Sequence, residues 1–417
     1  MNKTYSALNL FREGLRGQRG WAPAWRSPKP KPAYDVIVIG GGGHGLATAY
    51  YLAKVHGVRN VAVLEKGWIG GGNSGRNTTV VRSDYYYPES AALYDMSVRL
   101  YEGLSRELNY NIMLSQRGMM ILAHSEAEME IAARQVNAMQ INGIDSQLLD
   151  TEGVRKLAPI LNFDRGARYP IHGAMYQGRG GTARHDAVVW GFARGADRLG
   201  VDIIQNCEVT DVIVEGGRVT GVATTRGEIR ADRIGAAVAG HSSVLAHMAG
   251  YRLPIHSYAL QAFVSEPLKP VLDTVVLSPG HGTYVSQSDK GGLVFGGGLD
   301  RIPSYGQRGN LPVQETVIGG LSEMVPMFSK VKLLRHWAGI VDVTPDSSPI
   351  IGPSGVEGLY LNCGWGTGGF KAIPVGGYML AHILATGRHH DLSRPFDLSR
   401  FTRGRLIDEG AASGIAH

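Results

Sequence analysis

The sequence contains little cysteine and no long apolar run, and these shortages exclude several classes of protein. Cys207 and Cys363 are the only cysteines among 417 residues, too few for a disulfide-built scaffold or for a cysteine-built zinc or iron–sulfur site. No stretch approaches the about 20 apolar residues of a membrane-spanning helix, and neither a signal-peptide pattern nor metal-ligand spacing is present. We expect a cytoplasmic protein that holds no metal and crosses no membrane.

Charge is also scarce, and its most visible excess lies near the start of the chain. Charged residues make up 19% of the sequence, and the formal net charge of +6 is modest for this length, which does not indicate a nucleic-acid-binding face. Proline and tryptophan interrupt residues 1–33, so we expect an extended arm, either solvated or docked on another subunit, rather than an amphipathic transit peptide. The basic residues of this arm are Arg12, Arg16, Arg19, Arg26, Lys29 and Lys31.

Glycine, in contrast, is abundant, and one glycine-rich segment has a clear context. The 58 glycines indicate tight turns and close approaches of backbone to a ligand. Residues 40–45 hold the pattern G-x-G-x-x-G between a short apolar strand at 35–39 and a helical stretch at 46–53. In such a β-α-β unit Gly40 permits the turn, Gly42 lets the backbone approach a pyrophosphate, and Gly45 lets helix and strand pack closely. His44 lies in the same turn.

The residues that follow the second strand identify the dinucleotide. Glu65 ends the strand at 61–64, where its carboxylate would accept a hydrogen bond from a ribose 2′-hydroxyl and disfavour a 2′-phosphate. FAD and NAD both satisfy this pattern. The small, polar loop at 70–77 is suited to line the second half of an extended dinucleotide, whereas a simple dehydrogenase would continue into another helix, so we predict FAD.

The length of the chain predicts two domains, because a single core rarely grows this large. Longer amphipathic helices between about 90 and 165 and a run of strands between about 251 and 340 interrupt the α/β pattern. The expected parts are the arm at 1–33, a discontinuous FAD-binding domain at 34–90, 165–250 and 341–395, a mixed-sheet substrate domain at 91–164 and 251–340, and a tail at 396–417.

Three segments make the chain resemble the amine-oxidising FAD oxidoreductases: the loop at 71–74, the segment at 77–82 that ends in Arg82, and the segment at 364–371 that ends in Lys371. Within them it is similar to the β subunits of heterotetrameric sarcosine oxidases, from about Tyr34 to the C-terminus. The resemblance implies an α/β fold with a glutathione-reductase-like, Rossmann-type FAD-binding domain. It also implies α, γ and δ partner subunits.

The resemblance further implies two flavins. FAD should be non-covalent, because related monomeric enzymes attach it through a cysteine in the segment that aligns with 336–346, where this sequence has none. FMN should be linked to His185, with His172 as the second candidate, near the contact with the α subunit. The expected FAD-binding residues are Gly40, Gly42, His44, Gly45, Glu65, Lys66, Asn73, Ser74, Arg76, Asn77, Val209, Gly366, Gly369 and Lys371.

The implied reaction is the oxidation of sarcosine to glycine at FAD, with electrons passing to FMN and then to oxygen. The methylene unit leaves as formaldehyde or enters 5,10-methylenetetrahydrofolate, and hydrogen peroxide forms. Arg82 and Lys371 match the family's carboxylate-binding positions, and a bidentate contact to Arg82 with a point charge at Lys371 would select amino acids over simple amines. Lys290 matches a lysine that aids the reaction with oxygen, although its surroundings are also typical of a hairpin turn.

Two further readings of the same residues remain open. The chain could be another enzyme on this scaffold, such as a glycine, proline or opine oxidase or dehydrogenase. It could also be a flavin-holding assembly subunit without catalysis of its own. The tyrosines at 85–87, which follow Arg82, could cover the substrate methyl group, but a strand cannot point three consecutive side chains one way.

Overall fold

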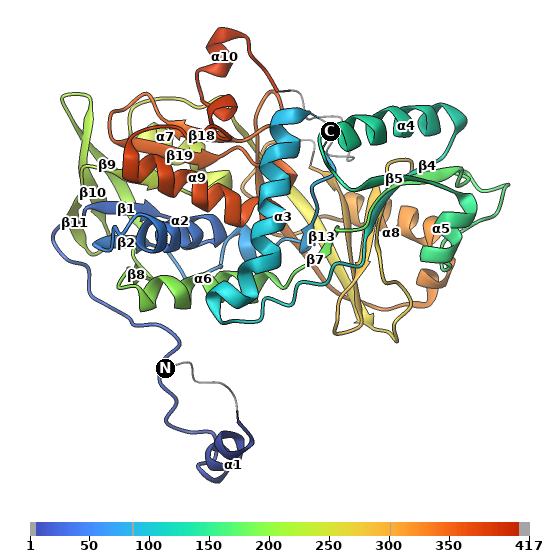
Figure 1. Cartoon of the computed structure of the whole chain (residues 1–417), viewed down its shortest axis with the longest axis horizontal. Helices are drawn as coiled ribbons and strands as arrows, with labels where there is room; N and C mark the ends of the chain where they lie inside the picture. The colour runs from blue at the N-terminus through green and yellow to red at the C-terminus, as the bar shows by residue number, and fades with distance from the viewer. Residues whose placement is uncertain (1–5, 86, 301, 408–417) are drawn as a thin grey trace.

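Two large sheets dominate the computed structural model, which describes residues 6–85, 87–300 and 302–407. The first belongs to the nucleotide half of the molecule and the second to the substrate half, with the long helix α3 (Pro88–Leu108) between them (Figure 1). The fold is mixed α/β, as predicted.

The six-stranded sheet of the nucleotide half is built around a completely buried strand. β1 (Val36–Ile39) has four buried residues in a row, as expected for a parallel strand covered on both faces. Both of its neighbours run parallel to it: β2 follows it in the same β-α-β unit, whereas β12 comes from about 200 residues further along the chain. The strand order is β18 (Ile350–Pro353), β19 (Leu359–Cys363), β12 (Ile234–Ala236), β1, β2 (Val61–Leu64) and β8 (Asp202–Ile204), and only β18 is antiparallel.

Different layers cover the two faces of this sheet. Val36 and Val38 point to helices α2 (Gly43–Val55), α6 (His185–Arg198) and α9 (Ile373–Thr386). Ile37 and Ile39 point to the opposite side, where they meet α7 (Ser242–Met248) and a three-stranded sheet. That sheet consists of β9 (Val209–Glu215), β10 (Arg218–Thr224) and β11 (Gly227–Arg230).

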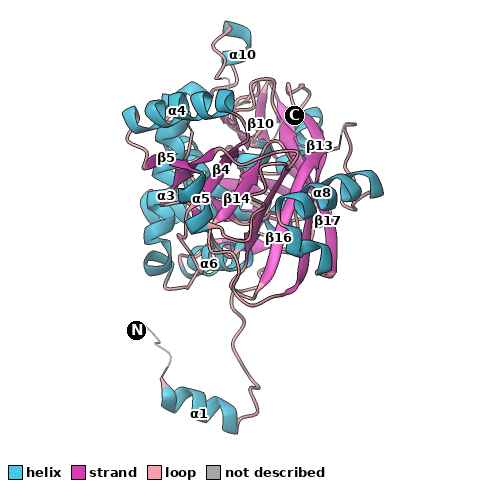
Figure 2. Cartoon of the chain, turned by 90° about the vertical axis from the view of Figure 1, so that its right-hand side faces the viewer, coloured by secondary structure: helices cyan, strands magenta, loops and turns pink. Residues whose placement is uncertain are grey.

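The eight-stranded sheet forms the substrate half, and its two faces also differ. Phe263, Val285 and Phe295 pack under α8 (Leu311–Met324), while α5 (Thr151–Leu157) covers the neighbouring strands (Figure 2). The opposite face turns toward the nucleotide half. The strand order is β17 (Leu333–Val343), β13 (His256–Pro267), β16 (Gly292–Leu299), β15 (Thr283–Gln287), β14 (Val275–Ser278), β4 (Met119–Ala123), β6 (Gly173–Gln177) and β5 (Ser146–Asp150).

The remaining elements are short or peripheral. Helix α4 (Glu126–Ile141) packs beside β5 and β6, and β3 (Val80–Val81) pairs with β7 (Gly181–Thr182). Helix α10 (Arg400–Arg403) lies near the C-terminus, and α1 (Ala7–Leu15) near the N-terminus. The 3₁₀ helices are η1 (Asn73–Gly75), η2 (Ala239–His241), η3 (Pro326–Lys330), η4 (Gly366–Gly368), η5 (Phe370–Ala372) and η6 (Arg394–Phe396).

One expected domain boundary lies elsewhere. The sequence placed residues 165–250 with the FAD-binding domain, but β6 pairs with β4 on one side and β5 on the other, inside the eight-stranded sheet. The first part of that segment therefore belongs to the substrate half. Hydrogen bonding to strands about 25 to 55 residues upstream decides this assignment, and no local pattern records it.

Both ends of the chain also differ from the expectation. The arm is not extended throughout, because α1 forms over Ala7–Leu15, ahead of the tryptophan and prolines that should have prevented a helix. The expected tail at 396–417 is packed over its first part: Arg400 is buried and donates to both oxygens of Asp346, at 2.8 and 2.9 Å. Residues 1–5 and 408–417 of these two segments lie outside the described residues.

Candidate active site

A cavity of about 580 Å³ lies between the two halves of the molecule. The glycine turn and the loop at 71–79 form its wall on the nucleotide side, and residues from β13, β15 and β17 form the wall on the substrate side. Its size falls in the range of cofactor and substrate pockets. Gly45 excepted, every FAD-binding residue expected from the sequence lines it.

The glycine turn has no room for side chains. A Cβ at Gly45 would lie 1.9 Å from the carbonyl oxygen of Gly40, and one at Gly40, which has φ of +109°, would lie 2.4 Å from the oxygen of Ala237. Gly45 thus supports the turn from behind the cavity. A Cβ at Gly43 would meet Ile373, the first residue of α9, at 2.3 Å. These contacts bring the N-terminus of α2, where amide groups favour a negative charge, to the cavity wall.

Two side chains hold the turn in this shape. The carboxylate of Glu65 accepts hydrogen bonds from the amides of Gly41 and Gly67, both at 2.8 Å. The hydroxyl of Ser74 accepts one from the amide of Gly43 at 2.9 Å. A carboxylate has about four acceptor positions, so Glu65 can also accept from the hydroxyls of a ribose.

Side chains of the loop after β2 bind backbone groups, both within the loop and on the substrate half. Asn73 accepts from the amide of Ile340 at 2.8 Å and donates to its carbonyl oxygen, which joins the loop to β17. The guanidinium of Arg76 donates to the carbonyl oxygens of Gly71 and Gly72. Asn77 accepts from the amide of Thr79 at 2.7 Å. These side chains shape the cavity wall by closing the loop on itself and on β17.

The segment before α9 closes the cavity from the other side. The ring of His44 is hydrogen-bonded through Nε2 to the carbonyl oxygen of Gly369 at 2.8 Å and lies 4.9 Å from the ring of Trp365. Burial lowers the pKa of His44 to about 4, so this imidazole is neutral. Gly366 and Gly369 expose backbone to the cavity.

The described residues fit a flavin dinucleotide. A glycine cradle that any Cβ would obstruct, a helix N-terminus and an acid at the end of β2 meet at one end of the cavity. Lys66 and Val209 line the same region. Cys207, which also lines the cavity, donates its backbone amide to the carbonyl oxygen of Glu65 at 2.9 Å. It therefore lies at the nucleotide end.

Two buried basic side chains, Lys371 and Arg82, define the substrate end of the cavity. Lys371 lines the cavity and donates to the carbonyl oxygen of Thr367 at 3.2 Å. Burial and the nearby positive charge of Arg82 lower the pKa of Lys371 well below its usual value, against the opposing effect of Asp84. Burial alone would lower the pKa of Arg82 as well, but its ion pair with Asp84 and the neighbouring tyrosines raise it overall.

Aromatic side chains surround these cations. Tyr85 and Tyr94 stack with ring centres 3.9 Å apart, and the guanidinium carbon of Arg82 lies 5.0 Å from the centre of the Tyr85 ring. A Cβ at Gly368 would meet the hydroxyl of Tyr94 at 2.2 Å. Of the tyrosines at 85–87, weighed from the sequence as a partial cover for the substrate, Tyr85 is beside Arg82, whereas Tyr86 lies outside the described residues.

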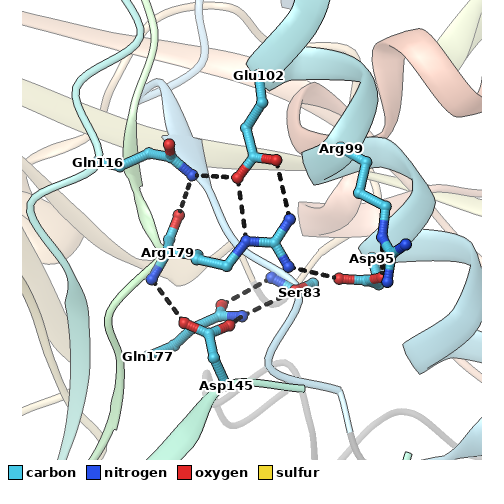
Figure 3. A network of polar contacts seen from close by, with 8 residues as sticks. All are labelled: Ser83, Asp95, Arg99, Glu102, Gln116, Asp145, Gln177 and Arg179. Carbon is cyan, nitrogen blue, oxygen red and sulfur yellow. Dashed lines mark hydrogen bonds and ion pairs between the residues drawn. The ribbon is translucent and has the colours of Figure 1, made fainter. Parts of the chain in front are cut away.

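A polar network holds the backbone directly after Arg82 (Figure 3). Buried Gln177 accepts from the amide of Ser83 at 2.9 Å and donates to its hydroxyl at 2.8 Å and to Asp145 at 2.9 Å. Arg179 extends the network to α3 through both oxygens of Glu102, each at 3.0 Å. No local pattern indicated Gln177, because its partners are about 30 and 94 residues away.

Asp342 is a second residue that was not identified from the sequence. It lines the cavity from β17 and accepts from the amide of Gly364 at 2.5 Å. Burial raises the pKa of Asp342 to about 7 in spite of this hydrogen bond and one from Trp365. An acidic residue within the otherwise apolar run at 338–343 was the signal that could have identified it.

The two histidines expected to carry a flavin lie in different surroundings. His185 begins α6 and is partly sheltered, and its buried Nδ1 has no hydrogen-bond partner among the described residues. Burial lowers the pKa of His185, which disfavours its doubly protonated, charged form. His172 is exposed. The segment just before His185 reaches the cavity wall, because β7 pairs with β3 and the amide of Ala183 donates to the carbonyl oxygen of Thr79 at 3.0 Å.

Lys290 is not brought to the cavity. It is exposed in the turn between β15 and β16, where Ser288 and Gly291 close the hairpin through a backbone hydrogen bond of 2.8 Å. This is the hairpin-turn alternative weighed from the sequence. Tyr284 of the adjoining strand does line the cavity.

Comparison with known proteins places this geometry in a class. A model of the family of FAD dependent oxidoreductases matches residues 35–383. The chain is 56% identical over 405 residues to sarcosine oxidase subunit beta of Rhizobium meliloti, covering 97% of each chain. It is 54% identical over 415 residues to sarcosine oxidase subunit beta of Rhodobacter capsulatus, covering 100% of each. The crystal structure of L-proline dehydrogenase from P. horikoshii is 27% identical with a TM-score of 0.85, covering 91% of this chain and 100% of that one.

The chain therefore belongs to the FAD-dependent oxidoreductases and, within them, to the family of sarcosine oxidase β subunits. The cavity, the glycine cradle and the buried cations are consistent with that membership. Across the ranges that the structure describes, no helix combines the length and the apolar character needed to cross a membrane.

Proposed function

We propose that this chain oxidises sarcosine to glycine as the β subunit of a hetero-oligomeric sarcosine oxidase. The observation that carries the proposal is a pair of buried basic side chains, Lys371, which lines the cavity, and Arg82, which lies beside it. Burial lowers the pKa of a basic group unless an anion lies nearby, and the pKa of Lys371 is lowered well below its usual value. Asp84 forms an ion pair with Arg82, and the carboxylate of an amino acid would supply the negative charge next to Lys371.

The two cations have unequal parts in holding the substrate. Lys371 lines the cavity and reaches the carboxylate directly, whereas Arg82 lies beside it, ion-paired with Asp84, and adds its charge. A bidentate contact from Arg82, as the sequence suggested, requires the guanidinium to turn from Asp84 toward the ligand. The stacked Tyr85 and Tyr94 exclude water from this end, which strengthens the charge interaction.

Non-covalent FAD and covalently bound FMN complete the proposal. The strand β17 presents residues 339–342 to the cavity without a cysteine, and Cys207 lies at the nucleotide end, which supports non-covalent FAD. When bound, the flavins would supply the two-electron oxidation of the substrate, onward transfer from FAD to FMN and the reduction of oxygen to hydrogen peroxide. The methylene unit leaves as formaldehyde or as 5,10-methylenetetrahydrofolate.

His185 is the proposed site of the FMN link, because its Nδ1 is sheltered and unpartnered and its segment pairs with the cavity wall. The test is the mass of flavin-bearing peptides from the acid-denatured, fully assembled enzyme. Flavin should remain on the peptide that contains His185, be absent after His185→Ala and persist after His172→Ala. Flavin on the His172 peptide, or on neither, contradicts the assignment.

The proposal includes α, γ and δ partner subunits and a cytoplasmic location. Cys207 and Cys363 are both buried and unpaired, which suits a reducing compartment. Residues near His185 would face the α subunit, since an FMN between subunits needs both of them.

The substrate is tested by a profile of kcat/KM on the assembled, FAD-loaded protein. Sarcosine should be preferred over glycine, proline and opines and over N-methylamines that lack a carboxylate, and Arg82→Met should lower kcat/KM for sarcosine. The structural likeness to a proline dehydrogenase makes proline the most informative competitor. Preference for proline or for a primary amine would overturn the assignment of sarcosine, and unchanged turnover in Arg82→Met would favour a flavin-holding subunit.

A further inference from the structure

Helix α1 is amphipathic and its apolar side is uncovered. Ser6 caps its N-terminus by accepting from the amide of Asn9 at 3.1 Å. Asn9, Arg12 and Glu13 form one side, where Arg12 donates to Asn9 at 3.0 Å and to Glu13 at 3.3 Å. The opposite side is apolar and exposed to solvent. The exposed fractions of its large side chains are 81% for Leu8, 65% for Leu10, 70% for Phe11 and 75% for Leu15.

This helix stands apart from the rest of the molecule in both views (Figures 1 and 2). A nine-residue helix alone in water is marginal, because nucleation costs more than so few hydrogen bonds return. Its stability in the working protein therefore has to come from a surface that covers Leu8, Phe11 and Leu15. Trp21, 59% exposed in the linker, would add to the covered area.

The second part of the arm is firmly attached. Arg26 donates from its backbone amide and its Nε to Asp197 at 3.2 and 2.8 Å, and Lys31 forms an ion pair with Asp202 at 2.8 Å. Trp25 packs against the core under α2 and α6. Anchoring at residues 25–31 fixes where the arm leaves the body, while the glycines at 17 and 20, both with positive φ, let it turn away.

All of the formal net charge of the protein resides in this arm. Residues 1–33 contain seven basic residues and one acidic residue, and the chain contains 42 and 36, so residues 34–417 hold 35 of each kind. The body is thus formally neutral while the arm carries +6. A basic, apolar segment on a neutral body fits a partner whose groove is apolar and bordered by acidic residues.

The comparisons indicate what kind of partner this is. The model of the FAD dependent oxidoreductase family begins at residue 35, directly after the arm, so the arm is an addition to the enzyme fold. The relative that aligns over 415 residues shares the arm and is named a subunit of a larger enzyme. An addition shared with a subunit points to assembly rather than to catalysis within the chain.

We propose that α1 docks in an apolar groove with an acidic border on a partner subunit of the same hetero-oligomer. This inference rests on the proposed function for the existence of that partner. Lys29 and Lys31 stay with the body, and α1 with Arg12, Arg16 and Arg19 reaches across to the neighbour. The arm then ties two subunits together without entering the cavity of either.

The test compares two sets of substitutions in the full-length chain, reconstituted with separately expressed α, γ and δ subunits. Leu8→Gln, Phe11→Gln and Leu15→Gln together remove the apolar side, and Asn9→Gln with Glu13→Gln alters only the polar side. The dissociation constant of the chain for its partner subunits should rise at least a hundredfold in the first variant and stay within threefold of the wild-type value in the second. FAD content and the thermal midpoint of the isolated chain should not change in either.

Each other outcome overturns the inference in a distinct way. Equal affinity of the apolar variant shows that α1 makes no energetically important contact. Binding of the wild-type chain, but not of the apolar variant, to phosphatidylglycerol vesicles with assembly unaffected assigns α1 to a lipid surface. If the wild-type subunits do not assemble, the chain has no such partner subunit and the inference is wrong. Sarcosine turnover, measured on the same samples, tests the proposed function separately.

Discussion

The two ends of the cavity are built in opposite ways. The nucleotide end takes its main residues from a short stretch, the glycine turn at 40–45, Glu65 and the loop at 73–77, and it uses backbone amides and a few side-chain acceptors. The substrate end combines Arg82 and Tyr94 with Asp342 and Lys371 from far along the chain, and it buries charge. The first end is encoded locally, whereas the second exists only after the whole chain has folded.

The difference has an energetic side. Backbone amides at a helix N-terminus are available at little cost once the helix forms. Buried Lys371, Arg82 and Asp342 each lose hydration, and other parts of the fold must offset this loss. We therefore expect changes at the nucleotide end to act on cofactor retention and changes at the substrate end to act on turnover and on pH dependence.

The largest expected effect is loss of the cofactor in Gly45→Ala. The new Cβ would lie 1.9 Å from a backbone oxygen, and relieving such overpacking costs about 1–3 kcal/mol or more, so FAD affinity should fall by about a hundredfold. The matched control is Gly103→Ala in α3, where a Cβ meets nothing within 4 Å; it should stabilise the helix by about 0.5–1 kcal/mol. Flavin absorbance after gel filtration measures the FAD content of each variant, and thermal unfolding measures its stability. Retained FAD in Gly45→Ala would contradict the view that the nucleotide end depends on this glycine.

Next in size is Lys371→Met at the opposite end. Removal of a hydrogen-bond partner of the substrate carboxylate should cost about 2 kcal/mol, or roughly thirtyfold in kcat/KM, while FAD content stays near that of the unmodified protein. Lys290→Met, at an exposed turn, serves as the control. Steady-state kinetics with sarcosine and a flavin count distinguish the two ends: loss of FAD from Lys371→Met would show that the ends are not separable.

A smaller effect is expected for Gln177→Leu, which removes the support behind Arg82. The amide of Ser83 and the carboxylate of Asp145 would lose partners, at about 1–3 kcal/mol for the unsatisfied groups, and KM for sarcosine should rise about tenfold. Gln116→Leu changes an exposed member of the same network (Figure 3) and should stay within about 0.5 kcal/mol. A lower thermal midpoint with unchanged KM would assign Gln177 a structural role alone.

The smallest effect concerns pH. Because the pKa of Asp342 is raised to about 7 in the fold, the folded chain binds this proton between about pH 4 and 7, where the unfolded chain has released it. The free energy of unfolding must therefore fall as pH rises through this window. Asp342→Asn should remove about 1 kcal/mol of that fall between pH 6 and 7, as measured by urea unfolding of the flavin-free protein, and parallel pH profiles for variant and wild type would contradict it.

Much of the fold and the nucleotide end followed from local sequence. The apolar strand before Gly40, the spacing of the glycines and the acid at the end of β2 are all contained in one β-α-β unit, so their physics is visible in about 30 residues. The same reasoning could not find Gln177 or Asp342, whose roles arise from partners brought together by sheet pairing. It misplaced β6 for the same reason.

The ends of the chain show a second limit. Prolines and glycines at 17–32 suggested an arm without structure, yet the nine residues ahead of them form α1. The tail was underestimated in the opposite direction, because Arg400 finds Asp346 only once the C-terminus folds back. Local composition describes how a segment behaves alone. The conformation of the tail depends on its contacts with the body of the protein, and that of α1 depends, as we propose, on a partner subunit.

The packing of α2 against α9 determines when during synthesis the cofactor can be enclosed. Helices α2 and α9 pack so closely that a Cβ at Gly43 would meet Ile373 and one at Gly377 would meet Ala47, and β12 lies between β1 and β19 in the sheet. The glycine turn leaves the ribosome early, but helix α9, which packs against it, and strand β19 of its sheet come from the last part of the chain. We therefore expect a nascent chain to carry an open, apolar β-α-β unit until translation is almost complete, which would make FAD capture a late event and leave this unit prone to aggregation during the interval.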